Sequence, residues 1–148
     1  MNNIIEAYKV YVASNFALYL KTHGAHFNVS GPNFPQLHTL FQSQYEDLWQ
    51  AYDAIGENIR KLDAFTPAGL KDYAKLSVID DVNGILSADG YIDRLLMDHE
   101  RMLVLIHKVF DFAEEQNLQD HMNFLAERLD KHSKHRWMLK TMLHPVTS

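Results

Sequence analysis

Apolar residues recur at helical spacing along four long segments of this chain, and this pattern constrains the fold more than any other feature. The segments cover residues 3–28, 34–62, 87–117 and 118–143. Because side chains three and four positions apart share one face of a helix, each segment has an apolar face to bury. No stretch alternates apolar and polar residues for long enough to predict a strand. The pattern predicts an all-α fold, a four-helix bundle, as a single domain over residues 1–148.

The connection between the second and third segments is long and reads DAFTPAGLKDYAKLSVIDDV. Thr66-Pro67 favours the start of a helix, so we expect a short extra helix inside this connection. The connection is long enough to cross from one end of the bundle to the other. The first and third connections are short, and each joins two neighbouring helices at one end.

The first connection is a tight bend with a histidine on each side of it. Gly31, Pro32 and Pro35 each disfavour a continuing helix, so the chain has to stop and reverse. His26 precedes the bend, and His38 follows it. We therefore expect the two histidines to lie close together.

Composition limits the classes of function. The chain has no cysteine, which excludes disulfides, iron–sulfur clusters and thiolate metal sites. Its 14 basic and 19 acidic residues give a formal net charge of −5, whereas nucleic-acid-binding proteins are typically basic. The N-terminus lacks the basic-then-apolar order of a secretory signal, and no apolar run reaches the length of a membrane span. We therefore expect a cytoplasmic protein that does not associate with a membrane.

The second helical segment carries another line of residues beside its core stripe: His38, Tyr45, Trp49, Asp53 and Gly56. These positions also have helical spacing, on a face next to the first. Large aromatic side chains there indicate burial on two sides, once in the bundle and once against another chain. The alternative is a wide core stripe in a monomer, and this segment alone leaves both interpretations open.

Asp53 and Glu57 lie four residues apart and therefore on one face of the second helix. Such acidic pairs are common on solvated faces, but this pair lies beside aromatic residues, where charge without a cation is unfavourable. His38 is 15 residues from Asp53, about 22 Å along one helix, so the two cannot share an ion within one chain. If two copies of the helix cross antiparallel near Tyr45 and Glu46, His38 of one copy meets Asp53 of the other.

Two histidines and two carboxylates are a suitable ligand set for divalent iron, zinc, manganese or cobalt. In this arrangement the bend supplies His26 and His38, and the second copy supplies Asp53 and Glu57. The Glu-x-x-His pairs typical of a di-iron site inside one bundle do not occur in the sequence. We therefore expect a metal site between subunits rather than within one.

These residues form part of an ordered motif: His26-Phe27, Gly31-Pro32-x-Phe34, Leu37-His38, Tyr45 and Asp53-x-x-x-Glu57. The motif resembles that of the Dps family of mini-ferritins, within the ferritin-like superfamily. The spacings of 12, 15 and 4 residues between the four ligand types match the ferroxidase motif of that family. The resemblance continues through TPAGLKDYAKLS and LAERLDKHSKHRWML, so it covers essentially the whole chain.

The resemblance implies a hollow dodecamer of ferritin-like bundles with an iron site at each twofold interface. It implies that His26 and His38 of one subunit and Asp53 and Glu57 of its mate bind iron, or zinc in its place. It further implies oxidation of Fe(II) by hydrogen peroxide or dioxygen, storage of the ferric product and protection against oxidative damage.

Three features depart from the usual pattern of that family. Phe27 replaces the tryptophan that usually follows the first histidine, which argues against an electron-donor role for this ring. At the threefold entry pores, Asp120 matches one of the family's aspartates and Asn123 replaces another, so we expect a weaker attraction for Fe(II). Positions that are acidic in many relatives, and nucleate mineral there, are neutral here: Thr39, Gln42 and Ser43.

Trp49 and several histidines lie near the motif or in later helices. His23 lies three residues before His26 and Trp49 lies near the expected twofold axis, so both are candidates for supporting the ligands, with a solvated helix position the alternative for His23. His99 falls in an apolar stripe and is expected to be a hydrogen-bonded core residue. For His132 and His135 we expect a surface position or a subunit contact, with an adventitious metal site as the alternative.

Two other functions stay open. One is a helical cage that binds DNA or a protein partner and forms no mineral, which the neutral Thr39, Gln42 and Ser43 favour. The other is a bundle whose site holds a structural zinc ion across the interface. We expect no direct DNA binding, because the chain has no basic tail and twelve copies would carry about −60 in total.

Overall fold

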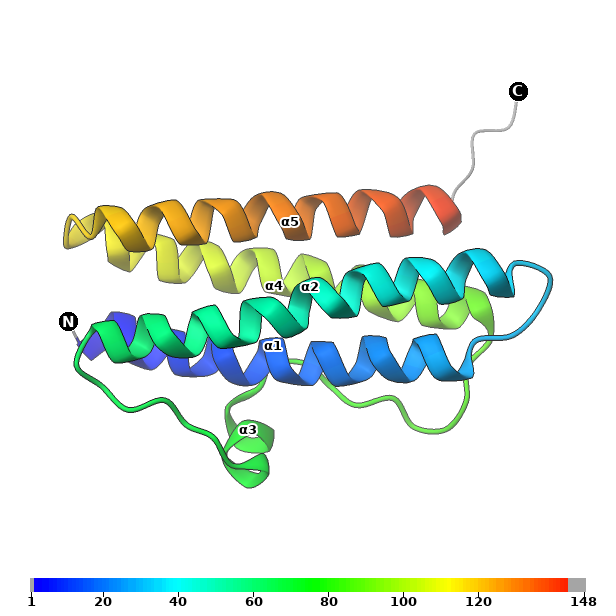
Figure 1. Cartoon of the computed structure of the whole chain (residues 1–148), viewed down its shortest axis with the longest axis horizontal. Helices are drawn as coiled ribbons and strands as arrows, with labels where there is room; N and C mark the ends of the chain where they lie inside the picture. Colours follow the sequence, from blue (N-terminus) through cyan, green and yellow to red (C-terminus); the bar gives the residue numbers. More distant parts are fainter. Residues whose placement is uncertain (1, 144–148) are drawn as a thin grey trace.

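The computed structural model describes residues 2–143 as five helices joined by loops (Figure 1). The helices are α1 (Asn2–Asn28), α2 (Phe34–Lys61), α3 (Leu70–Leu76), α4 (Ala88–Glu115) and α5 (Gln119–Leu143). The described residues contain no strand, and none of their helices is both long and apolar enough to cross a membrane. The predicted four-helix bundle with a short extra helix is confirmed. Met1 and residues 144–148 of the predicted domain lie outside the described part of the chain.

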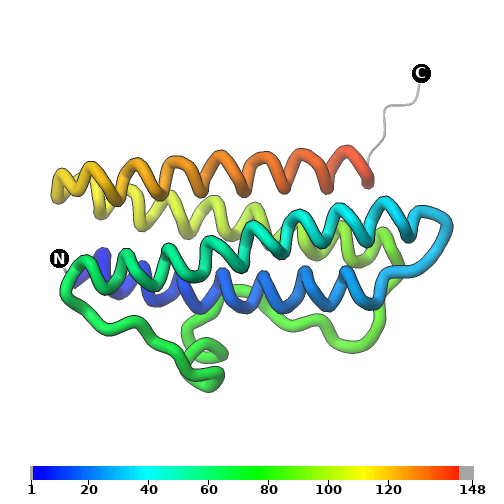
Figure 2. The backbone as a smooth tube through the Cα atoms, in the orientation of Figure 1, coloured from blue at the N-terminus to red at the C-terminus, as the bar shows by residue number. Residues whose placement is uncertain are grey.

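The four long helices form two antiparallel hairpins that pack side by side (Figure 1). α1 pairs with α2, α4 pairs with α5, and α1 also packs against α4. After α2 the chain returns along the length of the bundle, through α3, before α4 begins (Figure 2). The long connection therefore crosses the bundle as predicted, and α2 and α4 run in the same direction.

The short helix α3 begins at Leu70, later than the predicted start at Thr66-Pro67. Thr66 and Pro67 hold the preceding loop in place instead. The Thr66 hydroxyl donates a hydrogen bond to the Gly56 carbonyl of α2 at 2.6 Å, and the Pro67 carbonyl accepts one from the Tyr73 hydroxyl of α3. The loop is thus fixed against both helices.

The core between the hairpins contains most of the apolar residues that the periodicity assigns to it. Fully buried examples come from every long helix: Ile4, Tyr8, Leu18, Phe41, Leu48, Ile55, Ile59, Met102, Ile106, Leu125 and Leu139. Phe34 begins the apolar pattern of the second helical segment but lies outside this core, because 38% of it is exposed. It lies in the first turn of α2, at the end of the bundle, and its ring stacks on that of His38 at 4.9 Å.

The buried face of α5 is largely polar, which the apolar pattern does not reveal. Its buried residues are spaced by four and three positions: His121, Leu125, Arg128, His132, His135 and Leu139. His132 is fully buried and His135 is 8% exposed, so the prediction of a surface or subunit-contact position for this pair is wrong. Burial is tolerated because His132 bonds to His99 and His135 bonds to Asp47. His99 itself is a buried, hydrogen-bonded core residue, as predicted.

Candidate metal centre

The bend between α1 and α2 places the two helices side by side at one end of the bundle (Figure 1). Gly31 has a φ of 107°, in the region that glycine adopts most easily. Its carbonyl accepts a hydrogen bond from the Phe34 amide at 3.0 Å, which closes the turn. Pro35 lies in the first turn of α2, where its missing N–H has no helical partner to lose.

His26 and His38 lie together across this bend, as predicted. Their ring centroids are 3.7 Å apart, and the ring planes are inclined by 14°. Nδ1 of His26 donates to the His38 carbonyl at 2.7 Å, and Nδ1 of His38 donates to the His26 carbonyl at 2.8 Å. In the neutral rings these bonds place the proton on Nδ1, so each Nε2 carries a free lone pair. The backbone thereby fixes both imidazoles in the tautomer that binds a metal through Nε2.

His23 supports this pair from within α1. Its ring lies between Tyr45, stacked at 3.8 Å, and Phe27, stacked at 4.5 Å. Its Nδ1 is 2.8 Å from the Tyr19 hydroxyl, which is four residues earlier on the same helix face. Burial, followed by the charge of His26, lowers the pKa of His23. The side chain is therefore packed and partly buried beside His26, so the alternative of a solvated helix position is wrong, and its support of the ligands stays a prediction.

Asp53 and Glu57 lie in the last third of α2 and are exposed. They line a shallow pocket together with Tyr52, Gly56, Arg60 and Thr66. Between residues 2 and 143, no group of three or more His, Asp or Glu side chains is placed to hold a metal ion. One chain therefore brings His26 and His38 together but does not bring the carboxylates to them.

The face of α2 between the histidines and the carboxylates is aromatic and open. Trp49 is 53% exposed, and its ring lies 5.1 Å from that of Tyr19 and 6.1 Å from that of Tyr52. Tyr45 is half-buried. The wide-core alternative for this face is therefore wrong, because Trp49 and Asp53 do not enter the core of their own bundle.

The candidate pore residues lie at the start of α5. Asp120 is exposed and forms an ion pair with Lys61, at the end of α2, with 2.8 Å between the charged atoms. The hydrogen bond from Lys61 lowers the pKa of Asp120. Asn123 accepts a hydrogen bond from Gln119 at 2.9 Å. Lys61 is a residue that the sequence pattern gave no reason to connect with Asp120, because 59 positions separate them.

The three neutral positions of α2, Thr39, Gln42 and Ser43, are all exposed. Gln42 donates to the Glu46 carboxylate at 2.9 Å, and the Ser43 hydroxyl donates to the Leu40 carbonyl at 2.7 Å. Glu46 is exposed as well, so one carboxylate does lie next to the neutral positions. Glu46 is four residues from Gln42, so the sequence alone could have placed these two side chains on one face of the helix.

The comparison with known families decides what kind of chain this is. A family model described as the ferritin-like domain matches residues 6–147. The chain belongs to the ferritin-like domain family. Among relatives of this ferritin-like chain, DNA protection during starvation protein 2 of Bacillus anthracis is 29% identical over 141 residues, which cover 95% of this chain and 97% of the relative.

Solved structures agree with that assignment. Dps from Thermosynechococcus elongatus superposes on the ferritin-like chain with a TM-score of 0.94 at 26% identity, covering 98% of this chain and 92% of that one. Antigen TpF1 from Treponema pallidum superposes with a TM-score of 0.92 at 27% identity, covering 95% and 90%. The resemblance to Dps proteins that the motif predicted is confirmed.

Proposed function

We propose that this ferritin-like chain is a Dps-type ferroxidase that oxidises Fe(II) at sites shared between subunits. Its oxidant is hydrogen peroxide or dioxygen, and the ferric product is stored inside a dodecameric shell in the cytoplasm. Removing Fe(II) and peroxide together protects the cell, because the two otherwise generate hydroxyl radicals.

The observation that carries the proposal is the reciprocal bonding of His26 and His38 across the bend. Two neutral imidazoles held by backbone carbonyls, with Nε2 lone pairs free, form half of a ligand set for Fe(II). A partly buried histidine pair without a ligand role has no need for both rings to donate through the same nitrogen. Zinc has similar ligand preferences and competes for such a site.

The other half of the ligand set comes from a second copy of the chain. Asp53 and Glu57 are exposed on α2 and distant from His38 in the same chain. A twofold axis near Tyr45 and Glu46 brings these carboxylates to the histidines of the mate and produces two equivalent sites. The exposed ring of Trp49 then lies in the contact between the two α2 helices.

The reaction requires no protein group to change its oxidation state. Two Fe(II) ions give up one electron each, hydrogen peroxide takes both and its O–O bond breaks, and two protons complete two water molecules. The carboxylates of Asp53 and Glu57 offset the charge that the ions gain. His26 and His38 keep their Nδ1 protons throughout, because these are bonded to carbonyl oxygens.

The test is anaerobic loading with Fe(II) followed by hydrogen peroxide, with ferric absorbance as the signal. Wild type is compared with Asp53→Asn and with Asp111→Asn, a control that removes an exposed carboxylate from α4. We expect fast oxidation in wild type and in the control, and a loss on the order of 100-fold in Asp53→Asn. Equal, slow oxidation in all three proteins contradicts the proposal.

A second function is favoured by the neutral Thr39, Gln42 and Ser43, which are exposed on α2. It is a cage that forms no mineral and binds DNA or a protein partner. Light scattering after repeated Fe(II) and peroxide additions shows whether mineral grows, and a DNA mobility assay at low and physiological salt shows binding. Absent mineral together with a salt-sensitive DNA shift favours this second function.

A further inference from the structure

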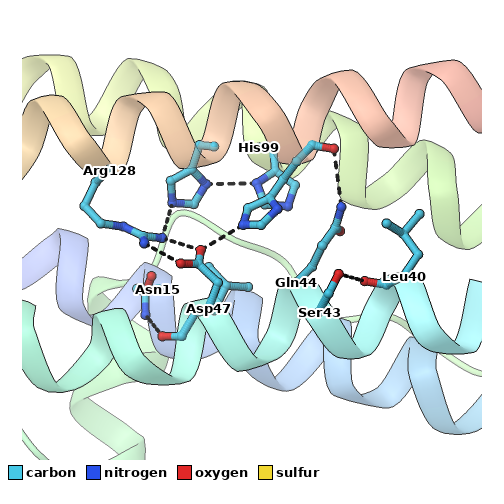
Figure 3. Close-up of polar contacts among 10 residues, drawn as sticks. Asn15, Leu40, Ser43, Gln44, Asp47, His99 and Arg128 are labelled. Carbon is cyan, nitrogen blue, oxygen red and sulfur yellow. Dashed lines mark hydrogen bonds and ion pairs between the residues drawn. The ribbon is translucent and has the colours of Figure 1, made fainter.

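A layer of buried ionisable side chains crosses the middle of the bundle (Figure 3). This mid-bundle layer consists of Asp47 from α2, His99 from α4, and Arg128, His132 and His135 from α5. His99 and His132 are fully buried, Arg128 and His135 are at least 92% buried, and the side chain of Asp47 is 21% exposed. The proposed iron chemistry uses none of these residues.

Asp47 is the anchor of the layer. Its two carboxylate oxygens accept hydrogen bonds from Arg128 at 2.8 and 2.9 Å, and Nε2 of His135 donates to the second oxygen at 2.8 Å. Burial alone would raise the pKa of Asp47, but the bonds from His135 and Arg128 outweigh it and hold the pKa well below its usual range. Asp47 and Arg128 therefore both stay charged at any pH near neutrality.

The hydrogen bonds assign the protons on the two remaining histidines. Nη2 of Arg128 lies 3.4 Å from Nε2 of His132, and because a guanidinium only donates, this Nε2 must be the acceptor. The proton of His132 is therefore on Nδ1, from which it is donated to Nδ1 of His99 at 2.9 Å. His99 carries its own proton on Nε2, a buried atom without a hydrogen-bond partner among the described residues. Both rings are neutral.

An added proton does not fit this arrangement. A protonated His132 would direct an N–H at the N–H of Arg128, and a protonated His99 would direct one at Nδ1–H of His132. Burial is the largest cause that lowers the pKa of both rings far below the usual value, and the neighbouring histidines and Arg128 lower it further. From α1, Tyr11 contributes no charge, because burial raises its pKa to about 12. In mild acid, the charges of Asp47, Arg128 and Tyr11 therefore do not change.

The layer also joins the two hairpins. Near the middle of the bundle, α2 is connected to α5 through the bonds of Asp47 to Arg128 and His135, with one further bond from Gln44 to the His135 carbonyl at 3.4 Å. α2 is the helix that carries His38, Asp53 and Glu57. Opening at this layer therefore frees the candidate metal-binding helix from α5.

We propose that the mid-bundle layer is an acid-sensitive latch, in which protonation of His99 and His132 releases α2 from α5. The latch goes beyond the proposed iron chemistry and does not depend on it. In the open state both rings reach solvent and regain an ordinary pKa near 6.5. Below that pH the equilibrium constant for opening therefore rises, by about 30-fold at pH 5 for each histidine that gains a proton.

The test is hydrogen exchange of the assembled protein, read by mass spectrometry and corrected for intrinsic rates, between pH 7.5 and pH 5. We expect protection of the segments 40–50 and 126–138 to fall at least 30-fold more over this range than protection at the α1–α4 contact. An equal loss of protection in all segments overturns the proposal.

Two variants test whether His132 causes the pH response of hydrogen exchange. His132→Gln keeps an acceptor for Arg128 but does not titrate, so we expect the pH response of both segments to shrink by about 30-fold. His107→Gln, which removes an exposed histidine of α4, should leave the response unchanged. If the two segments of His132→Gln lose as much protection between pH 7.5 and pH 5 as those of wild type, the proposal is overturned. If that variant does not fold, the wild-type comparison between segments still decides.

Discussion

His26 and His38 each donate a ring N–H to the backbone carbonyl of the other, at 2.7 and 2.8 Å, with their rings stacked across the α1–α2 bend. The backbone of the bend therefore fixes the position, tautomer and orientation of both imidazoles at once. Any change that alters the path of the chain between Asn28 and Phe34 should displace the pair. The stability of the bend and the chemistry of the site are expected to change together.

Replacement of Gly31 tests this dependence. Its φ of 107° is strained for any L side chain, although a Cβ there would meet no atom within 4 Å. We expect Gly31→Ala to lower the free energy of unfolding by about 1–3 kcal/mol and to weaken metal binding. Gly24→Ala is the control, because Gly24 is helical, its Cβ also meets nothing, and alanine should be neutral or stabilising there. Urea unfolding of both variants measures the difference, and equal stability contradicts the expectation.

Removal of the charge on Asp47 should destabilise the bundle strongly. Asp47→Asn leaves the buried guanidinium of Arg128 without its carboxylate partner, and we expect a loss of about 3–5 kcal/mol. Glu100→Gln is the matched control, because it breaks an ion pair with Arg136 in which both side chains are well exposed. Glu100→Gln should lower the free energy of unfolding by about 1 kcal/mol or less. Similar unfolding midpoints for the two variants would show that the Asp47 pair contributes little.

The stability of the whole chain should fall as the pH drops below about 6.5. Burial lowers the pKa of His99, His121 and His132 in the folded state. Below pH 6.5 the unfolded chain binds protons at these rings while the folded chain does not, so acid favours unfolding by up to about 1.4 kcal/mol per pH unit for each ring. Urea midpoints between pH 7.5 and pH 5 measure the slope. A flat profile contradicts the lowered pKa values of these three rings.

The ion pair between Lys61 and Asp120 should slow the entry of Fe(II), if Asp120 lines a pore. Lys61→Gln removes a positive charge 2.8 Å from this carboxylate, and we expect faster uptake, by on the order of tenfold or less and more weakly at high salt. Asp120→Asn should slow uptake. Lys9→Gln is the control, since Lys9 is paired with Glu6 near the start of α1. Stopped-flow iron uptake makes the comparison, and identical rates in Lys61→Gln and Lys9→Gln exclude Asp120 from the entry path.

Apolar periodicity and turn chemistry were sufficient to predict the bundle, its long connection and the closeness of His26 and His38. These features depend on local rules, because a helix face and a bend are specified by residues near one another in the chain. The position of Asp53 and Glu57 on one face of α2 also follows from their spacing of four residues. The site residues that depend on a second chain stay predictions, because one chain does not bring Asp53 to His38.

The mid-bundle layer could not be predicted by the same rules. His132 and His135 occupy core positions of α5 but are polar, so apolar periodicity does not mark them. The apolar Leu129 of the same helix is only partly buried. Their burial depends on Asp47 and Arg128, which are 81 positions apart and have to be paired before either can enter the core. The four-and-three spacing of the polar residues of α5 is the signal that was present in the sequence.

The central claim is that each metal site is shared between two subunits. Its most direct test mixes chains that carry different substitutions. In a dimer of one His38→Ala chain and one Asp53→Asn chain, one of the two shared sites recovers all four ligands. Random mixing should therefore restore about a quarter of wild-type Fe(II) oxidation, although each variant alone is inactive. Mixing His38→Ala with His26→Ala should restore nothing, because every site then lacks a histidine. Recovery only in the first mixture is the result that we predict, and equal activity in the two mixtures would contradict a site shared between subunits.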